Sequence, residues 1–132
     1  MKQELVKAAQ EALQQAYAPY SGYRVGAAIL AGQEVFKGSN IENASYGLTM
    51  CAERSAVATA ISSGARQIHG VAIAVEKGAP SPCGACRQVL REFGFDFPVY
   101  LVAGDGSVRE TTIKNLLPDS FGPEFLTKED KQ

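Results

Sequence analysis

The residues best suited to chemistry are three cysteines and one glutamate, which lie in two short motifs. One motif is Cys51-Ala52-Glu53, and the other is the Pro-Cys-Gly-Ala-Cys run that contains Cys83 and Cys86. Two cysteines separated by two residues can reach the same ion, and Cys51 can complete a set of three thiolates. Three thiolates on Zn²⁺ leave the fourth tetrahedral position to water, which is typical of catalytic zinc. We therefore predict a zinc site formed by Cys51, Cys83 and Cys86.

Glu53 and Arg54 follow the first cysteine closely enough to serve the same site. Glu53 is two residues past Cys51, so its carboxylate can lie beside a bound water without binding the metal. Three thiolates on one Zn²⁺ leave an excess negative charge, which hydrogen bonds from Arg54 and two helix N-termini would offset. Taken alone, each residue is also compatible with an ordinary role, Glu53 on a helix surface and Arg54 in an exposed ion pair.

Composition limits the class of protein. The 132 residues suffice for one domain, residues 1–132, of which we expect residues 127–132 to be a frayed tail. An odd number of cysteines argues against a disulfide framework, and no apolar run is long enough to span a membrane. With no targeting signal, we expect a cytoplasmic protein. Thirteen Lys and Arg against 14 Asp and Glu argue against nucleic acid or a membrane as partner.

Periodicity and turn residues predict four helices and five strands. We expect helices over residues 3–17, 51–62, 84–93 and 113–117, and strands over 25–30, 34–39, 71–75, 98–103 and 107–111. The first two strands form a hairpin, and the later strands alternate with helices. This order predicts an α/β fold, a three-layer α-β-α sandwich with a mixed five-stranded sheet. Both internal helices begin at a cysteine, which predicts that the cysteines converge.

At these motifs the sequence resembles a known family. The segments CAER (51–54) and SPCGACRQ (81–88) are similar to the signature of zinc-dependent cytidine deaminases, in the short, homotetrameric form with three cysteine ligands. The resemblance extends over most of the chain, through YAPYS (17–21), VGAA (25–28), NIENA (40–44), LLP (116–118) and SFGP (120–123).

The resemblance implies an activity and a set of roles. The reaction would be hydrolytic deamination of cytidine and 2′-deoxycytidine to the uridine nucleosides, with release of ammonia, as in pyrimidine salvage. Glu53 would be the general acid and base for this reaction. The backbone N–H of Ala52 would lie near the ring carbonyl of the base, and the carbonyl of Ser81 near its amine.

The same resemblance implies how the nucleoside is held. Asn40 and Glu42 match a pair that binds the ribose 3′-hydroxyl, and Tyr23 stands where the family often has a phenylalanine beside the base. Three further positions match residues that reach the site of a neighbouring subunit: Ala44, Tyr46 and Phe121. The resemblance thus implies a homotetramer with shared pockets. By themselves, Asn40 and Glu42 could equally satisfy a turn at a strand end, and Tyr46 and Phe121 could be ordinary packing residues.

Three other interpretations compete with this one. His69, the only histidine, could join the cysteines in a closed Cys₃His structural zinc site, although it precedes the strand at 71–75 and should therefore lie at the opposite edge of the sheet. A deaminase acting on nucleic acid would need an electropositive channel that the charge balance does not supply. Free cytosine or a nucleoside antibiotic is a third possible substrate, but cytosine has no ribose for Asn40 and Glu42 to hold.

Overall fold

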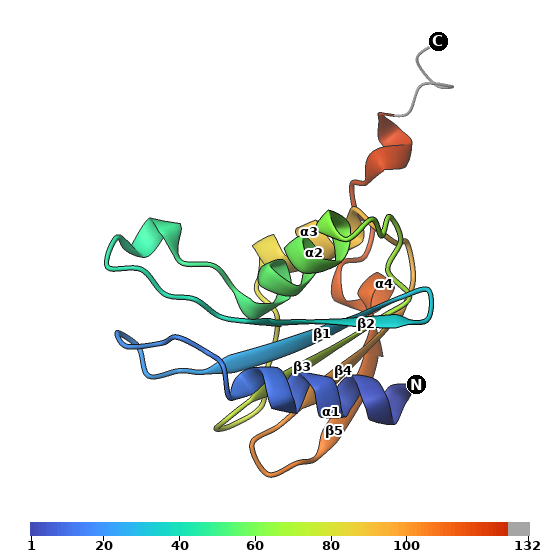
Figure 1. Ribbon diagram of the computed structural model, residues 1–132. Helices are drawn as coiled ribbons and strands as arrows, with labels where there is room; N and C mark the ends of the chain where they lie inside the picture. Colours follow the sequence, from blue (N-terminus) through green and yellow to red (C-terminus); the bar gives the residue numbers. More distant parts are fainter. Residues whose placement is uncertain (127–132) are drawn as a thin grey trace.

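The computed structural model describes residues 1–126, so the tail predicted at 127–132 lies outside the described residues. Its centre is a sheet in the order β2-β1-β3-β4-β5 (Figure 1). The strands are β1 (Val25–Ala31), β2 (Glu34–Ser39), β3 (Gly70–Val75), β4 (Pro98–Val102) and β5 (Val108–Thr112). Strands β3 and β4 are parallel and the other neighbouring pairs are antiparallel. The predicted mixed five-stranded sheet is therefore confirmed.

Helices cover both faces of this sheet. Helix α1 (Lys2–Leu13) lies on one face, and α2 (Ala52–Ser62) and α3 (Gly84–Arg91) lie on the other, with the short α4 (Ile113–Leu116) beside them (Figure 1). Each face has its own apolar core, one built around Leu5 and Ala72 and a larger one around Ile73 and Leu90. Every residue of β3 is buried, as expected for a central strand covered on both sides. The molecule is the predicted three-layer sandwich.

Two glycines set the distance between the sheet and its helices. A Cβ atom on Gly26 of β1 would lie 2.2 Å from the Ala9 carbonyl oxygen of α1. A Cβ atom on Gly38 of β2 would lie equally close, 2.2 Å, to the backbone nitrogen of Ala56 in α2. Neither position has room for a side chain. The two helices can therefore approach the two sheet faces at backbone distance.

The predicted element boundaries were wrong mainly at the first helix. Helix α1 ends at Leu13 instead of residue 17, because Tyr17 leaves the helix to form a parallel bridge with Ile41. Helix α3 ends at Arg91 instead of residue 93. Strand β2 has the predicted bounds, β5 is shifted by one residue at both ends, and the remaining elements differ from the prediction by one residue at one end. Two 3₁₀ helices, Tyr46–Leu48 and Pro123–Phe125, were not predicted.

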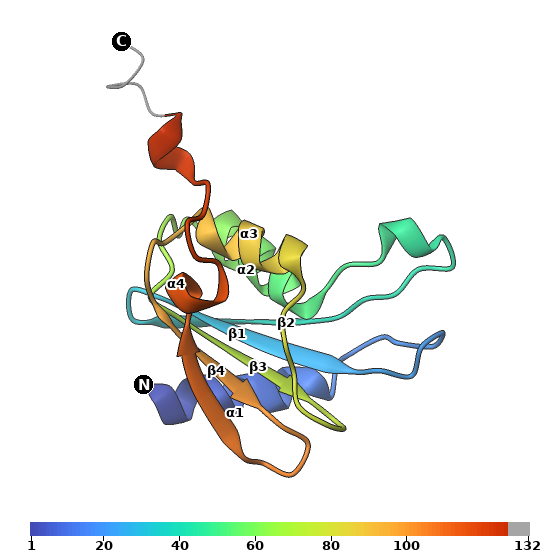
Figure 2. The same cartoon turned by 180° about the vertical axis from the view of Figure 1, so that it is seen from behind.

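Two loops project together from one end of the sandwich (Figures 1 and 2). They comprise residues 14–24 and 40–51, and they are joined by the bridge of Tyr17 to Ile41 and by the Tyr20 and Tyr46 rings, whose centroids are 6.1 Å apart. Both loops expose large apolar side chains, among them Tyr46 at 75% and Leu48 at 71%. Among residues 1–126, no helix is both long and apolar enough to cross a membrane.

Candidate active site

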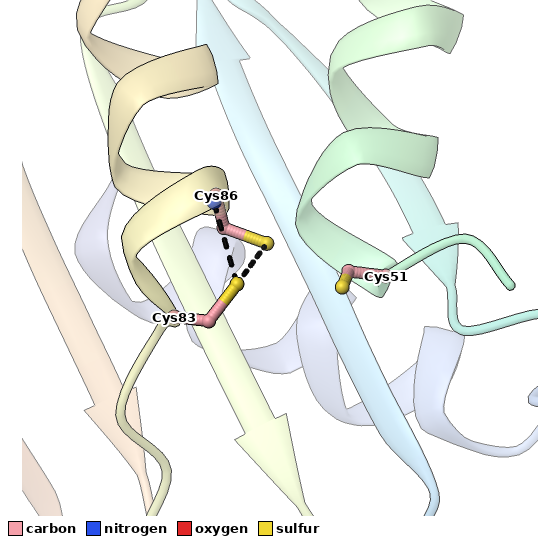
Figure 3. A group of neighbouring side chains, drawn as sticks. All are labelled: Cys51, Cys83 and Cys86. Carbon is pink, nitrogen blue, oxygen red and sulfur yellow. Dashed lines mark hydrogen bonds between the residues drawn. The ribbon is translucent and has the colours of Figure 1, made fainter. Parts of the chain in front are cut away.

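The three cysteines converge where two helices begin. Cys51 is the residue before α2 and Cys83 is the residue before α3, while Cys86 lies in the first turn of α3. Their sulfur atoms all lie within 4.8 Å of one another (Figure 3). Sulfurs that share one tetrahedral zinc ion are about 3.8 Å apart, given Zn–S bonds of about 2.3 Å. The donor set therefore fits one Zn²⁺ per chain, in agreement with the predicted cofactor.

The thiols differ in their electrostatic surroundings. The Cys83 sulfur accepts a hydrogen bond from the backbone N–H of Cys86 at 3.4 Å, and this bond lowers the pKa of the Cys83 thiol. Burial, followed by the negative charge of Glu53, raises the pKa of Cys86. A buried thiol among negative groups favours a cation in their midst, because the cation stabilises the thiolate form. The electrostatics agree with the geometry of the donor set.

Arg54 lies against the sulfur of Cys51. Its Nη2 is 3.3 Å from the sulfur of Cys51, and this contact raises the pKa of the guanidinium. The Nε of the same side chain is buried and has no hydrogen-bond partner among the described residues. A guanidinium beside a thiolate reduces the excess negative charge of a three-thiolate site.

Glu53 is buried next to the thiols, with only 6% of its surface exposed. Burial raises the pKa of its carboxyl, and the positive charge of Arg54 acts in the opposite direction. A carboxyl whose pKa is raised holds a proton more readily than an exposed carboxyl and can still release it, as a general acid and base must. Glu53 therefore has the surroundings of a general acid and base.

A cavity of about 210 Å³ opens in front of these residues. Its lining contains the three cysteines and Glu53 together with four other residues singled out from the sequence: Tyr23, Asn40, Ala52 and Ser81. Val25, Ile73, Val75 and Pro80 supply an apolar wall. A small cavity with an apolar wall and convergent polar groups is suited to a small planar ligand.

The Asn40 side chain makes two hydrogen bonds to the backbone and keeps further donors and acceptors free for a ligand. Its Oδ1 accepts the backbone N–H of Val25 at 2.9 Å, and its Nδ2 donates to the carbonyl of Tyr23 at 2.8 Å. An amide has a second N–H and further lone pairs, so Asn40 can bind a ligand and hold the 23–25 backbone at the same time. The structural role and the binding role considered for Asn40 are therefore compatible.

Glu42 lies outside that cavity, in a neighbouring hollow of about 360 Å³ shared with Tyr46. Its Oε1 accepts the backbone N–H groups of Tyr20 and Ser21 at 2.9 and 3.0 Å, and the hydroxyl of Ser21 bonds its Oε2. These bonds lower the pKa of Glu42. Thr49 lines both hollows, so the two hollows are adjacent.

Three predicted site residues line neither hollow: Arg54, which contacts Cys51 from behind the cavity lining, and Ala44 and Phe121. Ala44 is exposed in the projecting loop, and Phe121 is 55% exposed in the C-terminal segment. His69 is also remote from the thiols: it lines a surface hollow at the β1–β2 turn, where its Nδ1 accepts the backbone N–H of Gly32 at 2.9 Å. The metal-binding group found among residues 1–126 consists of cysteines alone.

Arg87 is a residue near the site that the sequence analysis missed. Its Nε donates to the carbonyl of Pro82 at 2.8 Å, its Nη2 to the Ser81 hydroxyl at 3.1 Å, and its Nη1 to the carbonyl of Leu116 at 2.7 Å. Arg87 thus ties the loop before Cys83 to the end of α4. Its position directly after Cys86 was the signal that could have drawn attention to it.

The fold and the three-thiol site define a zinc-binding deaminase domain. Residues 1–102 match the family described as the cytidine and deoxycytidylate deaminase zinc-binding region. The cytidine deaminase of Sporosarcina psychrophila is 44% identical over 128 residues, covering 95% of this chain and 94% of that protein. The corresponding protein of Halalkalibacterium halodurans is 47% identical over 128 residues, covering 95% and 97%. The crystal structure of cytidine deaminase from Burkholderia pseudomallei matches with a TM-score of 0.87 at 45% identity, over 92% of this chain and 99% of that chain.

The chain therefore belongs to the cytidine and deoxycytidylate deaminase family. The family and the fold class predicted from the sequence are both confirmed.

Proposed function

We propose that this chain hydrolyses cytidine and 2′-deoxycytidine to uridine and 2′-deoxyuridine with release of ammonia. The observation that carries the proposal is Glu53, a buried carboxyl that shares a 210 Å³ cavity with three clustered thiols. The named cytidine deaminases that this chain resembles over 95% of its length support the substrate class.

The ligands of the zinc ion in this proposal are Cys51, Cys83 and Cys86. Zinc, when bound, is a Lewis acid that lowers the pKa of a coordinated water. The chain's own contribution is to keep three thiolates together, with a helix N-terminus behind Cys51 and another behind Cys83. The positive charge of Arg54, in contact with Cys51, offsets part of the negative charge of the thiolates.

Glu53 moves the protons of the reaction. Its carboxylate accepts a proton from the attacking water as the bond between the water oxygen and C4 of the pyrimidine forms. The same carboxyl passes this proton to N3. It then accepts the second proton of the former water and delivers it to the amine, so that the C4–N4 bond breaks, the oxygen remains on C4 as a carbonyl, and ammonia leaves. A carboxyl with a pKa raised by burial is suited to both directions of transfer.

Backbone groups and polar side chains orient the nucleoside. Ala52 is the first residue of α2, so its N–H has no partner within the helix and can bind the ring carbonyl. The carbonyl of Ser81 receives the amine, and Tyr23 lies beside the base. Asn40 and Glu42 bind the ribose 3′-hydroxyl, both already fixed by bonds to the 20–25 backbone.

We further propose a cytoplasmic homotetramer in pyrimidine salvage, with no nucleic-acid or membrane partner. In this assembly Ala44, Tyr46 and Phe121 complete the pocket of a neighbouring subunit. The exposure of Tyr46 and Phe121, at 75% and 55%, supports this part of the proposal, because large apolar groups are commonly covered by a partner.

The test is a substrate panel. Purified protein is incubated with cytidine, 2′-deoxycytidine, cytosine and cytidine monophosphate, and ammonia release is followed with and without a zinc chelator. We expect release from the two nucleosides alone, and its loss with chelator. Activity confined to cytosine or to the monophosphate would overturn the nucleoside assignment.

A further inference from the structure

A buried arginine outside the proposed catalytic machinery lies at the last turn of α3. Arg91 is only 3% exposed, although its charge would ordinarily be solvated. Its Nε donates to the Ser120 hydroxyl at 2.6 Å, and its Nη2 forms an ion pair with Glu124. The guanidinium also lies over the ring of Phe95, 4.9 Å from the centroid. Both of its hydrogen-bonded partners belong to the C-terminal segment, residues 118–126.

The backbone of this segment is fitted to the guanidinium. A Cβ atom on Gly122 would lie 2.5 Å from Nη1 of Arg91, so any side chain at this position would displace the guanidinium from the backbone on which it packs. One turn earlier on α3, Gln88 donates its side-chain amide to the carbonyl of Phe121 at 3.0 Å. Polar contacts from α3 therefore hold the backbone of Phe121 and the residues on both sides of it.

Apolar burial contributes little to holding the C-terminal segment in place. Gly122 is the buried residue of the segment, and it is buried against Arg91 itself. Phe121 and Phe125 stack on each other with centroids 5.5 Å apart, yet they are 55% and 61% exposed. The polar contacts of Gln88 and Arg91 with the C-terminal segment, which we call the clasp, thus fix a pair of exposed aromatic rings.

The Phe121 and Phe125 rings do not line the 210 Å³ cavity of their own chain. Arg91 follows Cys83 by eight residues and Cys86 by five, which places it roughly 12 and 8 Å along the helix axis from these two residues. Phe121 is not among the residues that line the 210 Å³ cavity. Figures 1 and 2 show the segment projecting beyond the far end of α3, away from the two loops that project near the site.

We propose that Arg91 is a positioning residue that acts in trans: it holds Phe121 in the orientation in which that ring enters the active site of a second copy of this chain. The inference rests on the proposed function, in which Phe121 completes a neighbouring pocket. Arg91 is the group that holds the Phe121 ring in place before the subunits associate. The entropy cost of ordering residues 118–126 is therefore not paid on association.

Subunit mixing tests this proposal. Arg91→Met keeps an unbranched side chain but removes the charge and the donors, and Glu124→Gln weakens the same clasp from an exposed side chain that can change without unfolding the chain. Arg109→Met, on the exposed edge strand β5, is the matched control. Each variant is assayed alone for zinc content, Tm, kcat and KM. It is then co-expressed with a large excess of Glu53→Gln chains, which lack the proposed base but carry an intact clasp.

We expect Arg91→Met alone to keep zinc and to lose roughly tenfold to a hundredfold in kcat/KM for cytidine, the effect of a group displaced by about 1 Å. Glu124→Gln should lose less, and Arg109→Met nothing. In the mixed tetramers, activity per Arg91→Met chain should recover, because the neighbours supply a correctly held Phe121. Full activity of Arg91→Met alone would overturn the proposal, and so would a loss that mixing does not repair.

A Phe121→Ala variant separates this proposal from the proposed function. Wild-type protein inactive on nucleosides contradicts the proposed reaction before any variant is compared. Full activity of Phe121→Ala contradicts the assigned role of the ring, and with it the role of Arg91. Impaired Phe121→Ala that recovers on mixing, beside Arg91→Met that does not, contradicts the role of Arg91 alone.

Discussion

The close contact of Gly38 with helix α2 gives a prediction whose size can be worked from the structure. Gly38→Ala would place a Cβ atom 2.2 Å from the Ala56 nitrogen and 2.8 Å from the Ala52 carbonyl oxygen. Both atoms belong to the backbone of α2, so no flexible side chain can yield. Ordinary van der Waals contact requires about 3.5 Å, and α2 must therefore move away from the sheet by roughly 1 Å.

The displacement should affect stability and activity by different mechanisms. Overpacking costs about 1–3 kcal/mol, which corresponds to a fall in Tm of roughly 3 to 10 °C for a chain of this size. Helix α2 begins with Ala52 and carries Glu53 in its first turn. A shift of about 1 Å at a catalytic group can lower turnover about a hundredfold. We expect kcat on cytidine to fall by about that factor.

Gly26→Ala is the matched control. Its Cβ would lie 2.2 Å from the Ala9 carbonyl oxygen and 2.4 Å from the Leu13 nitrogen, a comparable overlap with the backbone of α1 on the opposite sheet face. Helix α1 contributes no residue to the cavity. The two variants should lose similar stability, measured by thermal unfolding, but only Gly38→Ala should lose most of its kcat. Equal losses of kcat in the two variants, or full activity of a destabilised Gly38→Ala, would show that displacing α2 does not displace Glu53.

Three further predictions concern individual contacts. Cys83→Ala should lose stoichiometric zinc and unfold at a lower temperature, as metal analysis and calorimetry would show; a variant retaining both would count against Cys83 as a ligand. Arg54→Gln should weaken zinc binding about 10–100-fold in competition with a chelator, whereas unchanged affinity would exclude its role at Cys51. Ser21→Ala removes a hydroxyl that lowers the pKa of Glu42 below the ordinary 4.5. The resulting loss of Tm should be largest above pH 4.5 and should shrink as pH falls through the lowered pKa; a loss that grows in acid is the opposite result.

Much of the fold and of the metal-binding group could be predicted from the sequence, because local signals determine them. Alternating and continuous apolar runs mark the strands, and the spacing of Cys83 and Cys86 is itself a metal-binding signal. Placing Cys51 with them required only the rule that sites collect at helix N-termini beyond the strand ends. The sequence therefore predicts residues whose partners are close along the chain, or whose positions follow from the order of the strands.

The remaining features depend on contacts between distant segments. Helix α1 ends early because Tyr17 pairs with Ile41, a bridge that helical periodicity does not reveal. The apolar residues that led us to extend the predicted helix to residue 17 belong, beyond Leu13, to the projecting loop of residues 14–24. The clasp of Arg91 on Ser120 joins residues 29 positions apart, and an arginine on a helix ordinarily indicates a solvated surface. No pattern in a single sequence distinguishes such a buried arginine from an exposed one.

Zinc content and turnover measured together on Glu53→Gln test whether Glu53 is the proton-transferring group of a zinc site. Glutamine preserves the shape of the side chain but cannot transfer the proton, and the three cysteines are unchanged. We predict one zinc ion per chain, an unchanged fold, and a kcat on cytidine lowered at least 10²–10⁴-fold, about the contribution of general acid–base catalysis. Turnover close to wild type in a variant with full zinc content would contradict the account.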